Sequence, residues 1–112
     1  MKLSTGKVIG GYTSVGWSSS GYWTSDCNAF LFSITNDYKH SVKSSQCSSY
    51  AIRRQSNYGP TFGSGLDLYI NSAMNGGYCS LGHTYECRTG YSGTSCRDDF
   101  CGSYNSWTID EL

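Results

Sequence analysis

The sequence predicts a single, mainly β domain, and three features of its 112 residues indicate this class. Glycine and serine are abundant while alanine is scarce, which disfavours long helices. Ten tyrosines and three tryptophans compensate for a short supply of aliphatic residues, because each can bury a large ring. Apolar residues alternate with the period of a strand in segments 29–34 and 66–70. We therefore expect an aromatic-rich β domain with an incomplete core.

The N-terminal half contains the strongest strand pattern. Val8–Tyr12 predicts a short strand with a bulge at its two glycines, and residues 14–25 predict a long loop with aromatic anchors. In Ala29–Ile34, Phe30 and Phe32 lie on one face and Leu31 on the other. A strand that is apolar on both faces is buried on both, so we expect it in the middle of a layered structure.

The segments after this strand carry weaker signals. Residues 35–38 have turn chemistry, and we expect strands within 40–44 and 49–54. Further on, 71–78 predict a turn-rich break and 86–102 a loop that carries three cysteines. Residues 106–112 alternate and predict a last strand.

The segment Tyr58–Ile70 is the most constrained part of the chain. It holds the only proline, Pro60, and then Gly63 and Gly65. Proline fixes its own φ, while glycines permit a positive φ or a bulge. Alternating residues 66–70 follow directly. We expect a sharply turning loop that leads into a half-buried strand, with Leu68 and Ile70 in the core.

Charge and hydropathy exclude several classes of protein. The net charge is zero and the eight basic residues are dispersed, so the chain lacks the basic stripe that nucleic acid or an anionic membrane requires. No apolar run is long enough to span a membrane. The N-terminus lacks the apolar core of a signal peptide, which favours a cytoplasmic location.

Six cysteines leave two interpretations open. An even count in a small domain indicates disulfides if the chain is secreted. The missing signal peptide and the absence of a glycosylation sequon modestly favour reduced thiols instead. The spacing of Cys87 and Cys96 is that of the last cysteines of an EGF-like hairpin, and Cys96 and Cys101 have a zinc-like spacing. We prefer packed thiols to both, and we expect no metal.

The sequence predicts no catalysis and no cofactor. Neither His40 nor His83 lies in a catalytic motif, and Ser64 lacks the spacing of a nucleophile elbow. The adjacent carboxylates at 98–99 and 110–111 point to opposite faces if they lie on strands. A peroxide-consuming thiol is a weak third hypothesis, because only Arg88 or Arg97 could stabilise its thiolate.

Motifs in a fixed order resemble the C-terminal part of the TLDc domain family. They are GGYTS (10–14), Trp17, SDCNAFLFSITN (25–36), Lys39, AI (51–52), YGPTFGSGLDLYI (58–70), CSLGHTYE (79–86), GYSGT (90–94) and CGSYNSWTIDEL (101–112). The resemblance covers almost the whole chain. It implies an antiparallel β-sandwich with flanking helices, an intracellular setting and no catalysis. It also implies protein interaction, with roles in resistance to oxidative stress and in binding subunits of the V-type proton ATPase.

The resemblance also implies a set of structural residues. Gly10, Gly11, Gly63 and Gly65 would set backbone turns, and Asp26 and Asp67 would fix loops through hydrogen bonds. Phe30 and Phe32 would join Leu68 and Ile70 in the core. The remaining motif positions are Pro60, Phe62, Gly82, Gly102, Ser103 and Glu111.

The chain departs from the family pattern at several positions. Leu66 stands where relatives often carry histidine, and Cys101 replaces a small or apolar residue. Upstream segments of the family are missing, so we expect residues 1–112 to form one partial TLDc domain. The alternative is a secreted, disulfide-stabilised β domain that binds a partner.

Overall fold

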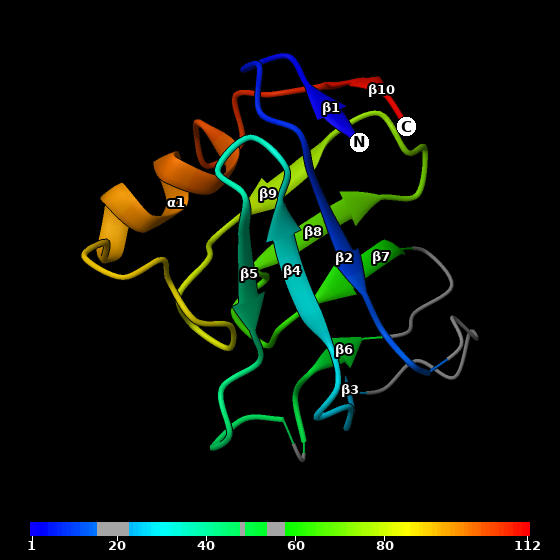
Figure 1. Cartoon of the computed structure of the whole chain (residues 1–112). Coiled ribbons are helices and arrows are strands. Elements are labelled where there is room, and N and C mark those ends of the chain that lie inside the picture. The colour runs from blue at the N-terminus through cyan, green and yellow to red at the C-terminus, as the bar shows by residue number, and fades with distance from the viewer. Residues whose placement is uncertain (16–22, 48, 54–57) are drawn as a thin grey trace.

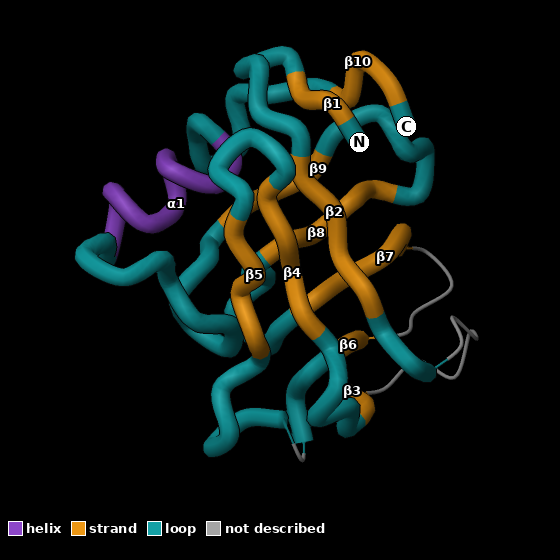
Figure 2. The backbone as a smooth tube through the Cα atoms, viewed as in Figure 1, coloured by secondary structure: helices purple, strands orange, loops and turns teal. Residues whose placement is uncertain are grey.

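The computed structural model describes residues 1–15, 23–47, 49–53 and 58–112. Within this part the chain forms two main antiparallel sheets, a two-stranded ladder and one helix (Figures 1 and 2). The elements are β1 (Lys2–Leu3), β2 (Ile9–Tyr12), β3 (Trp23–Thr24), β4 (Phe30–Ser33), β5 (Tyr38–Ser41), β6 (Ile52–Arg53), β7 (Tyr58–Phe62), β8 (Leu68–Asn71), β9 (Gly77–Cys79), α1 (Gly93–Cys101) and β10 (Ile109–Glu111). Most of the aromatic loop expected at 14–25 lies outside the described residues.

The two main sheets form the layers of a sandwich. One sheet has the order β2-β4-β5, and the other has the order β3-β6-β7-β8-β9. In Figure 1 the smaller sheet crosses in front of the larger one, and α1 lies at one side of both. The ladder of β1 and β10 lies at the end where the two termini meet. The mainly β, antiparallel fold predicted from the sequence is confirmed.

The core fills the space between the sheets. Its fully buried members include Leu31 from the smaller sheet and Leu68 from the larger one. Tyr85 is also fully buried, and its hydroxyl donates to the Ala51 carbonyl at 2.7 Å. Burial raises the pKa of Tyr85, so this phenol remains a neutral hydrogen-bond donor. The core therefore uses an aromatic residue where aliphatic ones are scarce.

Strand β4 is buried on one face only, so the prediction of two buried faces was wrong. Leu31 and Ser33 point into the core, whereas Phe30 and Phe32 are half-buried on the outer face. No layer covers that face among the described residues. Instead Tyr12 stacks on Phe30 at 5.1 Å, and the Lys39 ammonium lies 4.5 Å from the same ring. The rings shield one another, which explains an apolar pattern on an open face.

Residues 58–70 form a hairpin, in place of the expected loop before a strand. Strand β7 includes Pro60, which lies where the register with β8 shifts between Tyr58 and Thr61. A bulge of this kind tolerates a residue that has no N–H group. The turn uses positive φ at Gly63 (86°) and at Leu66 (58°). Leu68 and Ile70 are buried as predicted.

Residues 93–101 form helix α1, so the loop expected over 86–102 was wrong in part. The Ser92 N–H donates to Ser95 Oγ at 3.1 Å at the start of the helix. Gly102 ends it with φ of 90°, and its N–H donates to the Asp98 carbonyl. Only Cys96, Phe100 and Cys101 are buried in this helix. It therefore lacks the apolar stripe by which an amphipathic helix is identified in a sequence.

Three disulfides pair all six cysteines, so the prediction of reduced thiols was wrong. The pairs are Cys27–Cys47, Cys79–Cys101 and Cys87–Cys96. Cys79–Cys101 links α1 to β9 of the larger sheet, and Cys87–Cys96 links α1 to the segment between β9 and α1. The EGF-like spacing does correspond to a disulfide, but its second cysteine lies in a helix and not in a hairpin. No helix of the described residues is long and apolar enough to cross a bilayer.

Candidate functional site

Asp67 holds the segment 82–85 against the β7–β8 hairpin. Its fully buried carboxylate accepts backbone N–H groups of Gly82 at 3.2 Å, Thr84 at 2.9 Å and Tyr85 at 3.0 Å. Burial raises the pKa of Asp67, although these three donors oppose the shift. The hydrogen bonds expected of this residue are therefore present, and its role is to position a loop.

Asp26 has the same role at the other end of the sandwich. It accepts the Thr13 hydroxyl at 2.6 Å, the Ser14 N–H at 2.7 Å and the Asn28 N–H at 3.0 Å. Burial alone would raise the pKa of Asp26, but the hydrogen bonds from Thr13, Ser14 and Asn28 outweigh it and lower the pKa. Its carboxylate thus stays ionised and joins the end of β2 to the start of β4.

The paired glycines of β2 make room for aromatic rings, one on each face. Gly10 and Phe32 are register partners, and a Cβ at Gly10 would lie 2.4 Å from the Phe32 ring on the outer face. A Cβ at Gly11 would lie 2.5 Å from the Phe62 ring in the core. Phe32 therefore covers a glycine instead of entering the core, as expected for an aromatic residue opposite glycine in a sheet.

The remaining motif residues are placed around turns and ends. Gly65 packs against His83, Gly82 against Cys87, and Gly102 against Thr5. The Ser103 hydroxyl accepts the Ser106 N–H at 2.8 Å. Glu111 is exposed and pairs with Lys2 in the ladder of β1 and β10. None of these residues converges on a common cavity.

One side-chain pair that the sequence did not predict is Ser64 with His83. Ser64 Oγ lies 3.2 Å from His83 Nδ1, and Thr84 Oγ1 lies 3.1 Å from the same nitrogen. Among the described residues no carboxylate bonds to the imidazole, so nothing orients it as the base of a triad. The pair is a surface contact between two loops that Asp67 holds together.

A row of tyrosines lies on the outer face of the larger sheet. We call Tyr58, Tyr69, Tyr78 and Tyr104 the tyrosine column. Tyr69 and Tyr78 are register partners on β8 and β9 and stack at 5.4 Å. Tyr78 stacks on Tyr104 at 5.5 Å, and Tyr58 meets Tyr69 edge-on at 5.0 Å. Tyr104 is held there because its carbonyl accepts the Cys79 N–H at 2.8 Å.

An arginine lies at each end of the tyrosine column. The Arg53 guanidinium lies 5.0 Å from the Tyr58 ring and 5.2 Å from the Trp23 ring. At the far end, the Arg97 guanidinium lies 6.0 Å from Tyr104. Rings held by stacking and cation–π contacts lose little conformational freedom when a partner binds. The column is thus a pre-ordered surface.

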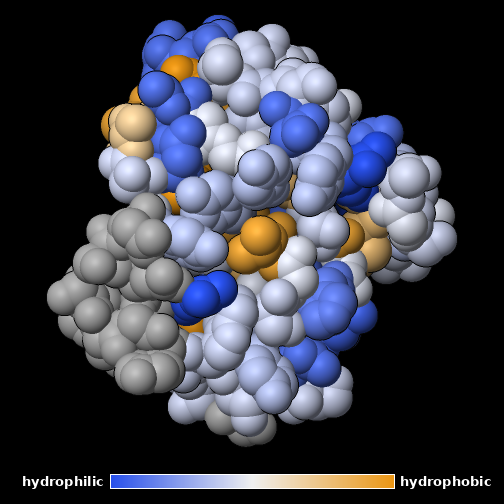
Figure 3. All heavy atoms as spheres, turned by 180° about the vertical axis from the view of Figure 1, so that it is seen from behind, coloured by the Kyte–Doolittle hydropathy of each residue, from blue (hydrophilic) through white to orange (hydrophobic). Residues whose placement is uncertain are grey.

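The column presents ring edges and hydroxyls to solvent, since stacking covers the faces of its inner rings. Tyr78 and Tyr104 are 39% and 44% exposed. Burial and the neighbouring Tyr58 and Tyr78 raise the pKa of Tyr69, so its phenol stays protonated. Figure 3 looks onto this side of the molecule, where pale residues of intermediate hydropathy cover most of the surface. Such amphipathic residues suit a protein contact that forms and separates in water.

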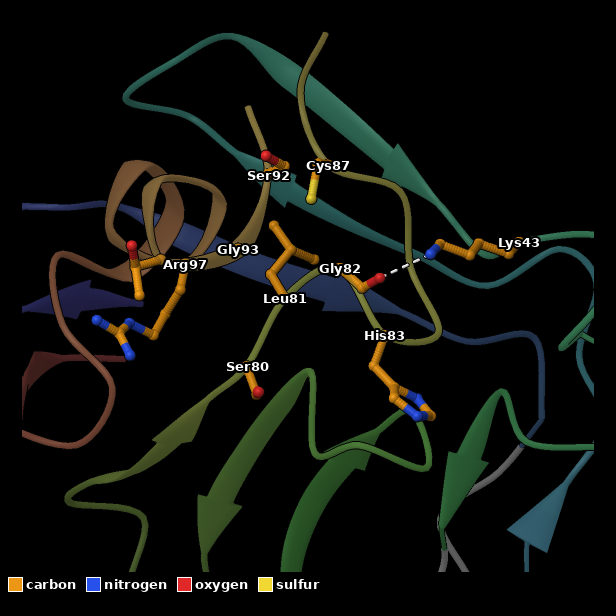
Figure 4. A pocket seen from close by; sticks show the side chains of 10 residues that line it. Lys43, Ser80, Leu81, Gly82, His83, Cys87, Ser92, Gly93 and Arg97 are labelled. Carbon is orange, nitrogen blue, oxygen red and sulfur yellow. Dashed lines mark hydrogen bonds between the residues drawn. The ribbon is translucent and has the colours of Figure 1, made fainter. Parts of the chain in front are cut away.

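A cleft of about 500 Å³ lies beside this surface, between the first turn of α1 and segment 80–87. Figure 4 shows the Cys87 sulfur pointing into it, and the Lys43 ammonium donates to the Gly82 carbonyl at 2.6 Å. Arg97 and His83 also line the cleft but point in different directions. These basic groups therefore do not converge on one ligand position, and no cluster of described residues could hold a metal ion.

Sequence patterns missed the tyrosine column for a definite reason. Alternation along β8 places the Tyr69 side chain on the face opposite to that of Leu68 and Ile70. That Tyr78 lies beside Tyr69 depends on strand register, and that Tyr104 continues the row depends on α1 and the Cys79–Cys101 disulfide. Neither can be read from spacing alone.

Comparison with known proteins gives one positive result. The family model for the TLDc domain matches residues 1–101 of this chain. No curated protein and no solved structure matches it significantly.

Proposed function

Because the chain belongs to the TLDc domain family, we propose that it is a non-catalytic protein-interaction module. Its contact surface is the outer face of the larger sheet, centred on the tyrosine column. The observation that carries this proposal is the stacked row of four tyrosines with an arginine at either end. Tyrosine and arginine are enriched among the residues that dominate binding energy at protein interfaces.

The absence of catalysis is part of the same proposal. Among the described residues, the Ser64–His83 contact brings a hydroxyl and an imidazole together, and its geometry supports a structural role. The buried carboxylates of Asp26 and Asp67 are fully engaged with loop donors. They are thus unsuited to proton transfer with a substrate.

The proposed partner follows from the resemblance to TLDc proteins. We propose subunits of the V-type proton ATPase as the first binding partner to test, and resistance to oxidative stress as the role. A cytoplasmic location stays a prediction from the sequence. The three disulfides favour the alternative, an oxidising compartment, because such bonds are rare in the cytosol.

The test measures binding of purified V-type ATPase to the immobilised, oxidised protein. Tyr78→Ala removes the centre of the column, and we expect it to weaken binding at least about tenfold. Tyr12→Ala is the matched control, because Tyr12 is an exposed, stacked tyrosine on the outer face of the smaller sheet. Equal losses for the two variants would exclude the column as the contact surface. No binding by the unmodified protein would exclude this partner.

A further inference from the structure

The three disulfides differ in how a thiol can reach them. Cys79 and Cys101 are both completely buried, so their bond is closed to attack. Cys96 is 1% exposed, but its partner Cys87 is half-buried and lines the cleft. In Figure 4 the Cys87 sulfur points into the cleft between Ser92 and Gly82. A thiol in the cleft therefore meets the Cys87 end of the Cys87–Cys96 bond first.

Gly82 lets this disulfide pack directly against the backbone of the cleft wall. A Cβ at position 82 would lie 2.9 Å from the Cys87 sulfur and 3.6 Å from the Cys96 sulfur. The φ of Gly82 is 115°, a conformation that other residues rarely adopt. The glycine thus makes room for the two sulfurs beside the cleft, and the Asp67 hydrogen bond to its N–H fixes its position.

Cys96 is well placed to leave as a thiolate. It lies in the first turn of α1, where the backbone N–H groups and the helix dipole stabilise negative charge. The cleft lining includes Lys43 and Arg97 and no carboxylate, but Arg97 Nε is paired with Asp98 Oδ1 at 2.9 Å, so Lys43 is the cation that acts on the cleft. Arg88, next to Cys87, is neutralised by Asp99 through an ion pair, with Nε 3.0 Å from Oδ2. The leaving group and the surroundings therefore favour exchange at this bond.

We propose that Cys87–Cys96 is a thiol–disulfide exchange site that accepts electrons from a dithiol reductant. The reductant's thiolate forms a bond to Cys87 Sγ, the Cys87–Cys96 bond breaks, and Cys96 leaves as a thiolate with the electron pair. The second thiol of the reductant gives its proton to the Cys96 thiolate, attacks the reductant's own sulfur in the mixed disulfide and releases Cys87 as a thiolate. The protein gains two electrons, and the reductant becomes a disulfide.

The Cys27–Cys47 bond, which is buried at Cys47 and exposed at Cys27, provides the comparison. Cys27 is exposed, so exposure alone predicts that this bond opens first. However, Cys27 follows the ionised carboxylate of Asp26, which repels an incoming thiolate, and neither of its cysteines lies in a helix. The order of opening thus separates our proposal from simple exposure.

The experiment treats the oxidised full chain with limiting dithiothreitol, alkylates the thiols at intervals and locates them by peptide mass spectrometry. We expect Cys87 and Cys96 to be alkylated about tenfold faster than Cys27 and Cys47, with Cys79–Cys101 last. Opening of Cys27–Cys47 first, or of all three bonds together, would overturn the proposal.

Two variants make the result specific. The double variant Cys27→Ala/Cys47→Ala lacks the competing disulfide, and we expect its Cys87–Cys96 bond to be reduced at an unchanged rate. Lys43→Met should slow attack by doubly charged 2-mercaptoethanesulfonate about threefold more than attack by cysteamine, whose thiolate form carries no net charge. Equal slowing with both thiols would show that the cleft does not act through its charge and would remove Lys43 from the site.

Discussion

At the scale of single residues, the glycines of β2 determine how closely aromatic rings approach the sheets. Gly11 faces the core, where the Phe62 ring occupies the space a side chain would need. Gly10 likewise leaves space for the Phe32 ring on the outer face. The sequence predicted a bulge and a backbone turn at these glycines, which was wrong, because β2 pairs with β4 in unbroken register. The glycines instead make room for the aromatic rings.

A glycine-to-alanine substitution tests whether the Phe62 ring needs the space beside Gly11. In Gly11→Ala the new Cβ would lie 2.5 Å from the Phe62 ring, so we expect a loss of about 1–3 kcal/mol in the free energy of unfolding. Gly76→Ala is the matched control, since its nearest neighbour would be the Trp107 carbonyl at 3.5 Å. Urea denaturation of both variants gives the comparison, and equal stability would contradict the ring contact.

His40 should make stability depend on pH. Its side chain is fully buried, its Nδ1 lies 2.9 Å from the Glu86 carbonyl, and its Nε2 has no partner among the described residues. Burial lowers the pKa of His40, although the Glu86 carbonyl and Asp99 oppose the shift and Arg88 adds to it. The unfolded chain therefore binds a proton first as the pH falls below about 6.5, and stability decreases there.

The measurement compares the unmodified protein with His40→Gln by urea denaturation at about pH 7.5 and about pH 5. Glutamine keeps a hydrogen-bond donor and removes the titration. We expect the free energy of unfolding of the unmodified protein to drop more across this range than that of the variant. The same drop in both proteins would show that His40 is not the responsible group.

At the scale of elements, the β7–β8 hairpin and α1 show what sequence patterns can and cannot predict. The alternation of Leu68 and Ile70 predicted β8 correctly because burial on one face leaves a period of two. Strand β7 was missed because its proline sits at a bulge. Helix α1 was missed because cystines replace the usual apolar stripe, and sequence alone does not show which cysteines pair.

Asp67 joins the hairpin to the next segment, and its substitution tests that link. Asp67→Ala leaves the N–H groups of Gly82, Thr84 and Tyr85 without their acceptor, and we expect a loss of about 3 kcal/mol or more. Asp67→Asn retains one acceptor oxygen and should lose less. Thermal unfolding ranks the three proteins, and a neutral alanine variant would contradict the role of Asp67.

At the scale of the whole molecule, the predicted fold class was right, but the disulfides that stabilise the core were not predicted. The ordered motifs indicated the TLDc family and an antiparallel β fold, and both are confirmed. Asp26 and Asp67 make the expected loop contacts. The tyrosine column and the cleft arise from residues that lie far apart in sequence, so only the assembled fold reveals them.

Two of the disulfides hold α1, the end of the tyrosine column and the wall of the cleft in place. They also make up for a short supply of aliphatic core residues, as in other small domains that need covalent support. The central claim is therefore that this TLDc domain is a disulfide-stabilised sandwich.

The most direct test is a thiol count on the purified protein in denaturant without reductant, followed by peptide mapping of the cystines. We expect no reactive thiol before reduction and six afterwards, with the pairs Cys27–Cys47, Cys79–Cys101 and Cys87–Cys96. Six reactive thiols before reduction, or a different pairing, would contradict this expectation.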